Sequence, residues 1–423
     1  MRKFLLEKGP YLRSVDEKRI STERMMIDVI IALAPIILFG WIFYGIIPFA
    51  KGYINFYGMI KPFLNVLVGA ASSLVFESLY FLCFKKSGSI KNALLDAKNS
   101  FALIPGIILA LILPVNIQLY VIVYGCFFAN IVFKMLFGGL GHNIFNPALI
   151  GYAIAVTTFS GLVAESLDTQ SVFVNQVINI SATSTPLAAL ATNSKMVGSF
   201  LVDKNVLVNG YGGLFNMFIG LKNGMMGEVS GVLCVAAFIY LLVRRVINWR
   251  VPVFYVGGVF VLTYLVAIVN KIEGPALGIW FPTFNVVTGG LLFGAVFMAT
   301  EPVTTPKTPN GKIIFALGCA VFTVLFRLIG MFNEGVCTAL LFMSLFTPII
   351  DKFAAKNRGS IITSKMVLRY LVLFILFGLI SFYTIYKTTS VPKDDYPIVE
   401  IDVNNYMMGD DYNGWWSKFQ EES

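Results

Sequence analysis

The chain has 423 residues, of which 57% are hydrophobic and only 13% are charged. Soluble domains carry about a quarter charged residues, so this composition excludes a soluble globular protein of this size. The basic residues behind the net charge of +9 fall in short clusters between apolar runs, which favours membrane-topology signals over nucleic-acid binding. The sequence therefore predicts an all-α polytopic membrane protein.

The N-terminal segment, residues 1–24, contains seven Lys or Arg. The apolar run that follows, from Met25 to about Ala50, is too long for the core of a signal peptide. We therefore expect residues 1–24 to stay in the cytoplasm.

Eleven apolar segments are candidate membrane spans, because about 20 mainly apolar residues cross the hydrocarbon core. They lie at 25–50, 62–84, 101–114, 118–137, 147–163, 227–243, 251–269, 284–300, 312–330, 334–350 and 367–387. If every segment crosses, the basic clusters after the second, sixth and tenth share the cytoplasmic side with the N-terminus. The acidic tail from Val391 then lies outside.

Two segments are too short to cross the membrane alone. Residues 102–114 rise about 20 Å as a helix against a core of about 30 Å, and residues 286–300 are little longer and contain a Gly pair. Each takes third place in a set of five segments, and each set continues with a similar motif, around Asn146 and around Asn333. An odd number of spans inverts the second set relative to the first. The sequence predicts two inverted five-helix repeats with short broken helices, plus one extra C-terminal transmembrane helix.

These expectations divide the chain into five parts. They are a cytoplasmic segment (1–24), a first membrane repeat (25–163), an external loop (164–226), a second membrane repeat (227–358), and an extra transmembrane helix with an acidic external tail (359–423).

No metal site is expected. The five cysteines sit in apolar runs without a CxxC spacing, which favours packing over iron–sulfur or zinc ligation, and the single histidine, His142, cannot hold a metal alone. No catalytic residue can be named from the sequence.

Two groups within spans are costly to bury. Glu77 lies near the inner end of the second segment and Lys134 near the inner end of the fourth, so the two can pair. Lys134 can equally extend to the membrane surface, and so can Arg327 near the outer end of the ninth. Glu77 is our candidate for an ion-pathway residue.

The stretch "NISATSTPLAAL", residues 179–190, interrupts the apolar pattern with several hydroxyls. Thr185 followed by Pro186 is typical of a helix N-terminus, where the hydroxyl accepts an amide hydrogen bond and proline suits the first helical position. A simple cap therefore explains the motif without any functional role.

Three motifs carry a family resemblance. "GGLGHNIFNPALIGYAI" (138–154), "STPLA" (184–188) and "FMATEPVTTP" (297–306) follow an N-terminal "PYLRS" and "MMIDVIIALAP". In this order they resemble the family that includes the D subunit of the Rnf complex and the B subunit of the sodium-translocating NADH:quinone reductase. The resemblance covers about residues 10–352.

In that family a flavin transferase attaches FMN to a threonine through a phosphodiester bond. The resemblance implies covalent FMN on Thr185, with Thr183 as the alternative acceptor. Upstream this sequence departs from the family pattern, because Asn179 stands at the acidic position. The resemblance also allows a second, non-covalent flavin, riboflavin or FMN, beside Asn146 and Thr300. Both residues can instead serve only as caps or turns.

The function implied is that of a flavin-carrying subunit in a redox-driven Na⁺ or H⁺ pump, passing electrons between ferredoxin and NAD in a prokaryotic cell membrane. The implied partners are iron–sulfur and NAD-binding subunits, a second covalent-flavin subunit, the flavin transferase and lipid, with no nucleic acid. The alternatives are the quinone reductase B subunit and a flavin-free secondary transporter, since inverted repeats with broken helices also occur in transporters.

Overall fold

The computed structural model describes residues 22–85, 89–178, 213–272, 278–329, 335–355 and 364–389, together with the single positions 186, 187, 190 and 208. Every regular element in these ranges is a helix. The all-α prediction is therefore confirmed for the described part of the chain.

The elements of the first half run in chain order as follows. They are α1 (Thr22–Trp41), η1 (Ile42–Ile46), α2 (Ile47–Ala50), α3 (Phe56–Cys83), α4 (Ile90–Asn99), α5 (Leu103–Ile112), α6 (Leu119–Phe127), η2 (Phe128–Met135), α7 (Pro147–Thr158) and α8 (Ser160–Ile178).

The second half also contains both long and short helices. Its elements are α11 (Leu214–Ile219), α12 (Gly231–Val243), α13 (Arg250–Val269), α15 (Trp280–Val287), α16 (Leu291–Phe293), η4 (Gly294–Met298), α17 (Pro309–Leu328), α18 (Val336–Ala355) and α19 (Ser364–Thr389).

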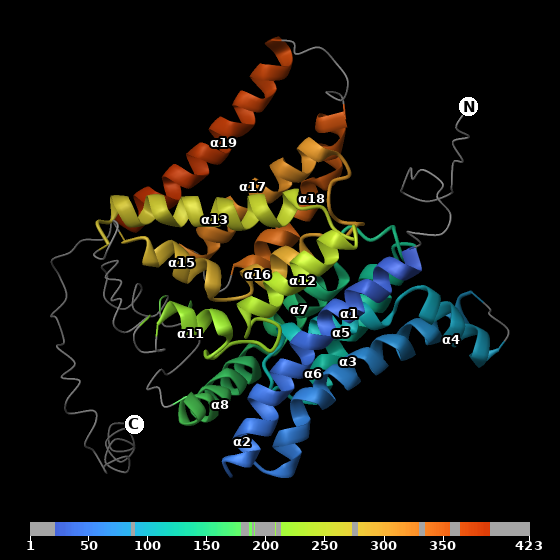
Figure 1. Ribbon diagram of the computed structural model, residues 1–423. Helices are drawn as coiled ribbons and strands as arrows, with labels where there is room; N and C mark the ends of the chain where they lie inside the picture. The colour runs from blue at the N-terminus through green and yellow to red at the C-terminus, as the bar shows by residue number, and fades with distance from the viewer. Residues whose placement is uncertain are drawn as a thin grey trace, which may run out of the picture.

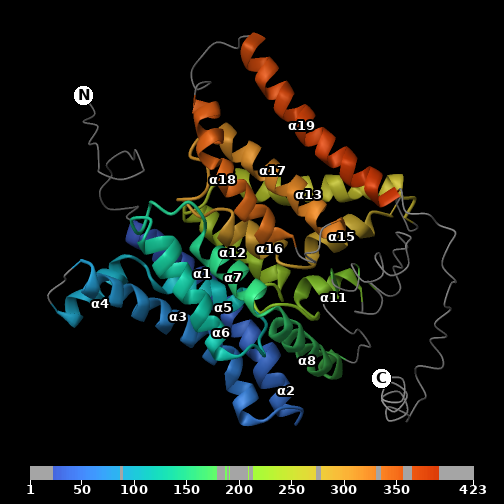
Figure 2. The ribbon, with the colours of Figure 1, turned by 180° about the vertical axis from the view of Figure 1, so that it is seen from behind.

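Membrane spans account for most of these helices. Six are long and apolar enough to cross a membrane, and nine spans result if each of three bent helix pairs counts as one. Two further apolar helices, Leu119–Met135 and Gly231–Val243, are shorter. Figure 1 places α4 and the start of α1 at one end of the helix bundle and α2, α8 and α11 at the other. Figure 2 shows the same arrangement from behind.

Each of the two short segments singled out in the sequence has a break, at the start of the first segment and inside the second. The pair α4 and α5 bends by 63°, and so does the pair formed by α15 and the run from Leu291 to Met298. Gly289, with a φ of +67°, lies in the second break, where a left-handed backbone favours glycine.

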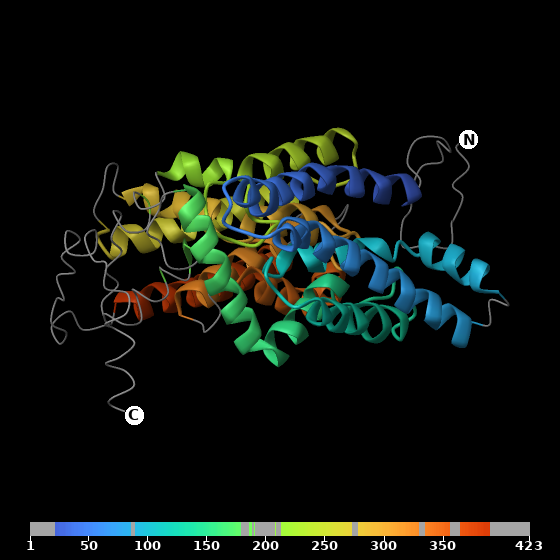
Figure 3. The ribbon, with the colours of Figure 1, turned by 90° about the horizontal axis from the view of Figure 1, so that it is seen from below.

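A third bend was not anticipated. The sequence analysis treats 147–163 as one span and 164–226 as a loop, whereas α7 ends at Thr158 and α8 turns away by 95° and stays helical to Ile178. The physical reason is composition, because polar side chains in α8, such as Glu165, Asp168 and Gln170, disfavour a continuation through the membrane. Figure 3 shows α8 crossing the direction of the neighbouring helices.

The two halves share a sequence feature that supports the predicted repeat. Gly125 and Cys126 in the first half match Gly318 and Cys319 in the second, and in both a cation follows the cysteine by eight positions. Both cysteines are fully buried, and Lys134 and Arg327 are the two cations. The inverted orientation of the halves stays a prediction.

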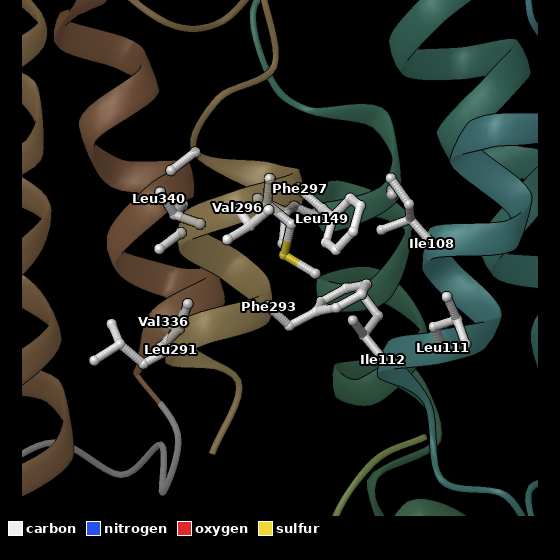
Figure 4. Packing of buried hydrophobic residues seen from close by; sticks show 14 of the residues in the cluster. Ile108, Leu111, Ile112, Leu149, Leu291, Phe293, Val296, Phe297, Val336 and Leu340 are labelled. Atoms are coloured by element: carbon white, nitrogen blue, oxygen red, sulfur yellow. The ribbon is translucent and has the colours of Figure 1, made fainter. Parts of the chain in front are cut away.

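The core lies where the broken elements of the two halves meet. In Figure 4 the rings of Phe293 and Phe297 point from α16 and η4 toward Ile108 and Ile112 of α5. All four side chains are at most 6% exposed. Burial of such aromatic and aliphatic side chains contributes about 1.5–3 kcal/mol each, so this contact is a main source of cohesion between the halves.

A polar contact joins the first helix of each half. The carboxylate of Asp28 in α1 accepts hydrogen bonds from Arg244, at the end of α12, over 3.0 to 3.2 Å, and from the Tyr240 hydroxyl over 3.1 Å. The Asp28 side chain is only 6% exposed, whereas Arg244 is 35% exposed.

The extra helix α19 contacts α17, and its C-terminal end meets the end of α13, from which the rest of α19 diverges (Figure 1). Asn270 Nδ2 donates to Thr388 Oγ1 over 3.2 Å, and the ring of Tyr370 packs edge-on against Phe353. The other face of α19 carries large exposed apolar side chains, including Phe374 and Phe382. This is the pattern of a helix that contacts lipid on its outer side.

A glycine contact between α3 and α5 gives a first prediction. A Cβ at Gly106 would collide with the backbone of Gly69, whereas one at Gly257 in α13 would meet nothing within 4 Å. We expect Gly106→Ala to lower the free energy of unfolding by about 1–3 kcal/mol through overpacking. Gly257→Ala should leave it unchanged or raise it by up to about 1 kcal/mol, because alanine is the better helix former. Thermal unfolding of the detergent-solubilised protein distinguishes the two, and equal unfolding temperatures would contradict the close α3–α5 contact.

Candidate functional site

The first break is held by a buried ion pair. Lys134 Nζ lies 2.5 Å from Glu77 Oε1 and donates to the Ser100 carbonyl over 2.8 Å, just after α4 ends. Glu77 is 0% and Lys134 2% exposed, so neither side chain extends to the surface. The predicted pairing of Glu77 with Lys134 is confirmed.

The second break is also held by cations. Arg327 donates from Nη1 to the Asn285 carbonyl over 2.6 Å and from Nη2 to the Thr288 carbonyl over 3.5 Å. Lys222 Nζ donates to the Val287 carbonyl. Since Arg327 is 4% exposed, it is buried against α15 rather than extended to the surface. Cations suit this place, because the last carbonyls of a helix carry partial negative charge.

A carboxylate lies on the other side of the same break. A Cβ added to Gly290 would lie 2.9 Å from Glu228 Oε1. Gly290 immediately precedes α16, whose first amide groups carry partial positive charge. The charges therefore match the helix ends at this break. The cations Lys222 and Arg327 lie at the C-terminal end of α15, and the carboxylate of Glu228 lies at the N-terminal end of α16.

Lys222 and Glu228 belong to a buried loop, "GLKNGMMGEVS" (220–230). The Gly227 amide donates to the Leu111 carbonyl, near the end of α5, over 2.8 Å. The Tyr44 hydroxyl accepts from the Gly224 amide over 3.2 Å, and Gln170 Nε2 of α8 donates to the Gly224 carbonyl over 2.6 Å. The loop thus connects the end of α5 with the break in the second half.

The two other motifs flagged in the sequence meet each other. Asn143 Nδ2, in the loop before α7, donates to Glu301 Oε1 over 3.2 Å, and Thr304 Oγ1 donates to Glu301 Oε2 over 3.0 Å. Glu301 lies in the loop between η4 and α17. Its burial raises the pKa of the carboxyl to about 7, although the hydrogen bonds from Thr304 and Asn143 and the charge of Lys134 oppose the rise.

Asn146 and Thr300 lie in these motifs and make local bonds. Asn146 Oδ1 accepts from the amides of Ala148 and Leu149 over 3.0 and 3.4 Å, so Asn146 caps α7. Thr300 Oγ1 donates to the Val296 carbonyl over 2.5 Å. The Asn146 contacts fit the capping alternative, whereas the Thr300 hydroxyl bonds a carbonyl one helical turn earlier.

Thr185 and Thr183 lie outside the described residues. The chain is described again at Pro186 and Leu187, which begin a helical turn, and at Leu190. Leu187 and Leu190 are 3% and 4% exposed and pack into a cluster with Phe281 and Phe284 of α15. The residues directly after the predicted attachment site are therefore fixed to the second broken helix.

The cysteines behave as packing residues in three cases. Cys126, Cys234 and Cys319 are buried, while Cys337 is half-buried and Cys83 is exposed. Within the described ranges, no group of three or more His, Cys, Asp or Glu side chains could hold a metal ion.

Sequence reasoning missed Lys222 and Glu228, which it placed in or beside an external loop. The available signal was two charged residues within a Gly- and Met-rich run directly before an apolar segment. Such a run can line a buried turn, because glycines allow close backbone approach.

Comparison with known proteins adds to this geometry. The sequence model of the NQR2, RnfD, RnfE family matches residues 7–359 of the chain. The chain belongs to this family. The match ends before α19, so the family core comprises the two halves and their broken helices.

Its relatives include the D subunits of two ferredoxin:NAD oxidoreductases. The one from the proton-translocating ferredoxin:NAD(+) oxidoreductase complex of Clostridium ljungdahlii is 35% identical over 83% of this chain and 94% of its own length. Its counterpart from the Na(+)-translocating complex of Acetobacterium woodii is 28% identical over 82% of this chain and 93% of its own length. The B subunit of the Na(+)-translocating NADH-quinone reductase of Pseudomonas aeruginosa, strain LESB58, is 30% identical over 61% of this chain and 60% of its own length.

The ion pair at the first break gives a second prediction. Lys134→Met leaves the Glu77 carboxylate buried without its cation, which typically costs about 3–5 kcal/mol of stability. We expect the double variant Glu77→Gln/Lys134→Met to recover a large part of that loss. Thermal unfolding of the four members of this mutant cycle measures the coupling, with Lys91→Met on exposed α4 as control. Additive effects of the two substitutions would disprove the pairing.

Glu301 gives a third prediction. Its pKa of about 7 lies above the ordinary 4.5, so its contribution to stability is present below pH 4.5 and is lost as the pH rises through 7. Relative to Glu301→Gln, the wild-type protein should therefore lose stability between about pH 5 and pH 8. Unfolding temperatures measured across this interval test the sign. A difference that does not change with pH would exclude a raised pKa.

Proposed function

We propose that this chain is the D subunit of an ion-translocating ferredoxin:NAD oxidoreductase of the Rnf type. The observation that carries the proposal is the similarity to two such subunits over more than nine-tenths of their length. In this role the chain holds a flavin in the membrane, while partner subunits bind ferredoxin and NAD. Three buried charges at a break within the membrane region support a site that does more than hold a bundle together.

Covalent FMN on Thr185 is part of this proposal. The described residues are compatible with an attached phosphodiester, because Arg327 brings a positive charge beside the segment that follows the acceptor. The flavin would supply the redox chemistry, and the chain would hold and orient it. Thr183 is the alternative acceptor. The missing acid at Asn179 requires a transferase that accepts an amide there.

A second, non-covalent flavin, riboflavin or FMN, is proposed near Asn146 and Thr300. The contact between Asn143 and Glu301 supports a shared location for the two motifs. The side-chain amide, the hydroxyl of Thr304 and the carboxyl of Glu301 offer donors and acceptors of the kind that bind flavin rings and ribityl chains.

Glu77 is the proposed ion-pathway residue. Its carboxylate is buried in a membrane helix, where such groups are costly, and its charge is balanced by Lys134. A cation that approached Glu77 would have to compete with the Lys134 ammonium. The pumped ion can be Na⁺ or H⁺.

The proposed orientation has a cytoplasmic N-terminus and an external C-terminal tail in the prokaryotic cell membrane. Basic residues support it, since Lys85 and Arg245 follow α3 and α12 and Lys352 lies in the last turn of α18, all at helix ends that would face the cytoplasm. The segment with Thr185 then lies outside, where the flavin transferase would act. The proposed partners are iron–sulfur and NAD-binding subunits and a second covalent-flavin subunit.

The quinone reductase B subunit is the alternative function. It is less favoured, because this chain covers only 60% of the length of such a relative. A ferredoxin-dependent or a quinone-dependent reaction in membranes that contain the assembled complex separates the two. A flavin-free transporter is excluded if the purified protein carries a covalent flavin.

Denaturing-gel fluorescence is the direct test and our fourth prediction. The wild-type chain, made in a host with the flavin transferase, should show a fluorescent flavin band. Thr185→Ala should lose the band completely, because no hydroxyl remains to form the ester, and Thr183→Ala should keep it. Loss of the band in Thr183→Ala alone would move the attachment to Thr183. A non-fluorescent wild-type protein would refute flavin attachment altogether.

A further inference from the structure

We infer that Leu187 and Gly289 form an anchor that fixes the covalent flavin to the break between α15 and α16. This inference rests on the proposed attachment of FMN to Thr185. Leu187 and Gly289 act as positioning residues, and neither takes part in the redox chemistry.

The anchor is a tight contact. The Leu187 side chain occupies the space into which any side chain at position 289 would extend, so a Cβ there would collide with Leu187 Cδ1. Gly289 also has a φ of +67°, a conformation that favours glycine. Two independent constraints, the close contact with Leu187 and the left-handed backbone, therefore favour glycine at position 289.

The anchored segment is held at two points. Leu187 and Leu190 are three residues apart, a spacing that places side chains on one face of a helical turn. Both are buried against the α15 cluster that includes Phe281 and Phe284. A single leucine would fix a position, whereas two also hinder rotation of the segment about that position.

Chain geometry then limits where the flavin can be. The proposed attachment point is only two residues before Leu187 in the sequence, and two residues span at most about 7 Å. The Cβ position of Gly289 that Leu187 blocks is 3.1 Å from Arg327 Nη2. The anchoring residue Leu187 therefore lies beside the Arg327 guanidinium, a cation of the kind that binds phosphate groups.

The consequence is that flavin position and break geometry are mechanically linked. Arg327 bonds the carbonyls of Asn285 and Thr288 at this break. Any shift of α15 relative to α16 thus moves the surface at Gly289 that Leu187 contacts. The segment that carries the flavin would move with it.

The test uses the assembled complex and reads the rotational freedom of the flavin. Fluorescence anisotropy is measured for the wild type and for Leu187→Ala, after subtraction of the signal of the Thr185→Ala complex, which keeps every other flavin. Leu187→Ala removes the anchoring side chain, and Leu187→Met retains its volume and serves as the conservative control. We expect the flavin band to persist in both, with a clear fall of anisotropy in Leu187→Ala only.

Gly289 is tested with a matched glycine. Gly289→Ala should lower the anisotropy as Leu187→Ala does, because the added methyl displaces Leu187. Gly52→Ala is the control, since Gly52 has a similar φ of +77° but a Cβ there meets nothing within 4 Å. If Gly289→Ala does not accumulate, the two Leu187 variants decide the question alone.

The outcomes separate the two proposals. A wild-type chain without a flavin band overturns the proposed function, and the anchor with it. An intact band with unchanged anisotropy in Leu187→Ala overturns the anchor and leaves the proposed function standing. Loss of the band in Leu187→Ala also overturns the anchor, because Leu187 would then act in recognition by the transferase.

Discussion

A helix that stops inside a bilayer leaves backbone carbonyls without water to bond, and each unsatisfied group costs several kcal/mol. This constraint governs the chain, because both of its short membrane segments are broken. At the first break Lys134 donates to the Ser100 carbonyl, and at the second Arg327 and Lys222 donate to carbonyls at the end of α15. These buried cations supply hydrogen-bond donors to the carbonyls at the breaks. The bonded carbonyls in turn make the breaks less costly.

The two breaks are stabilised by different arrangements of charged side chains. In the first half a carboxylate, Glu77, balances the cation directly, so the pair is compact and its charges cancel. In the second half two cations and Glu228 are spread over both helix ends: Lys222 and Glu228 reach the break from the buried loop, and Arg327 reaches it from α17. The two breaks thus place their charges by different means, the first in one direct ion pair and the second on both helix ends.

The sequence was sufficient for features that depend on local composition. Apolar runs located the helices, their shortness identified both breaks, and the positions of Glu77 and Lys134 near the same membrane face predicted their pair. It was insufficient where burial depends on distant contacts. Lys222 is buried because it reaches the Val287 carbonyl, 65 residues away, and no local pattern encodes such a partner. Gln170 of α8 is buried by distant contacts too, because it accepts from the Val115 amide and donates to Asn223 and to the Gly224 carbonyl.

The contact between Asp28 and Arg244 also bears on how the protein is made. The two residues are 216 positions apart, so α1 emerges from the ribosome long before α12 exists. Until then the Asp28 carboxylate has no access to this partner and is expensive to leave in lipid. Biosynthesis therefore has a waiting period, in which the first half must be held near the insertion machinery or with its start still in contact with water. The final position of the first helix is set only when the second half arrives.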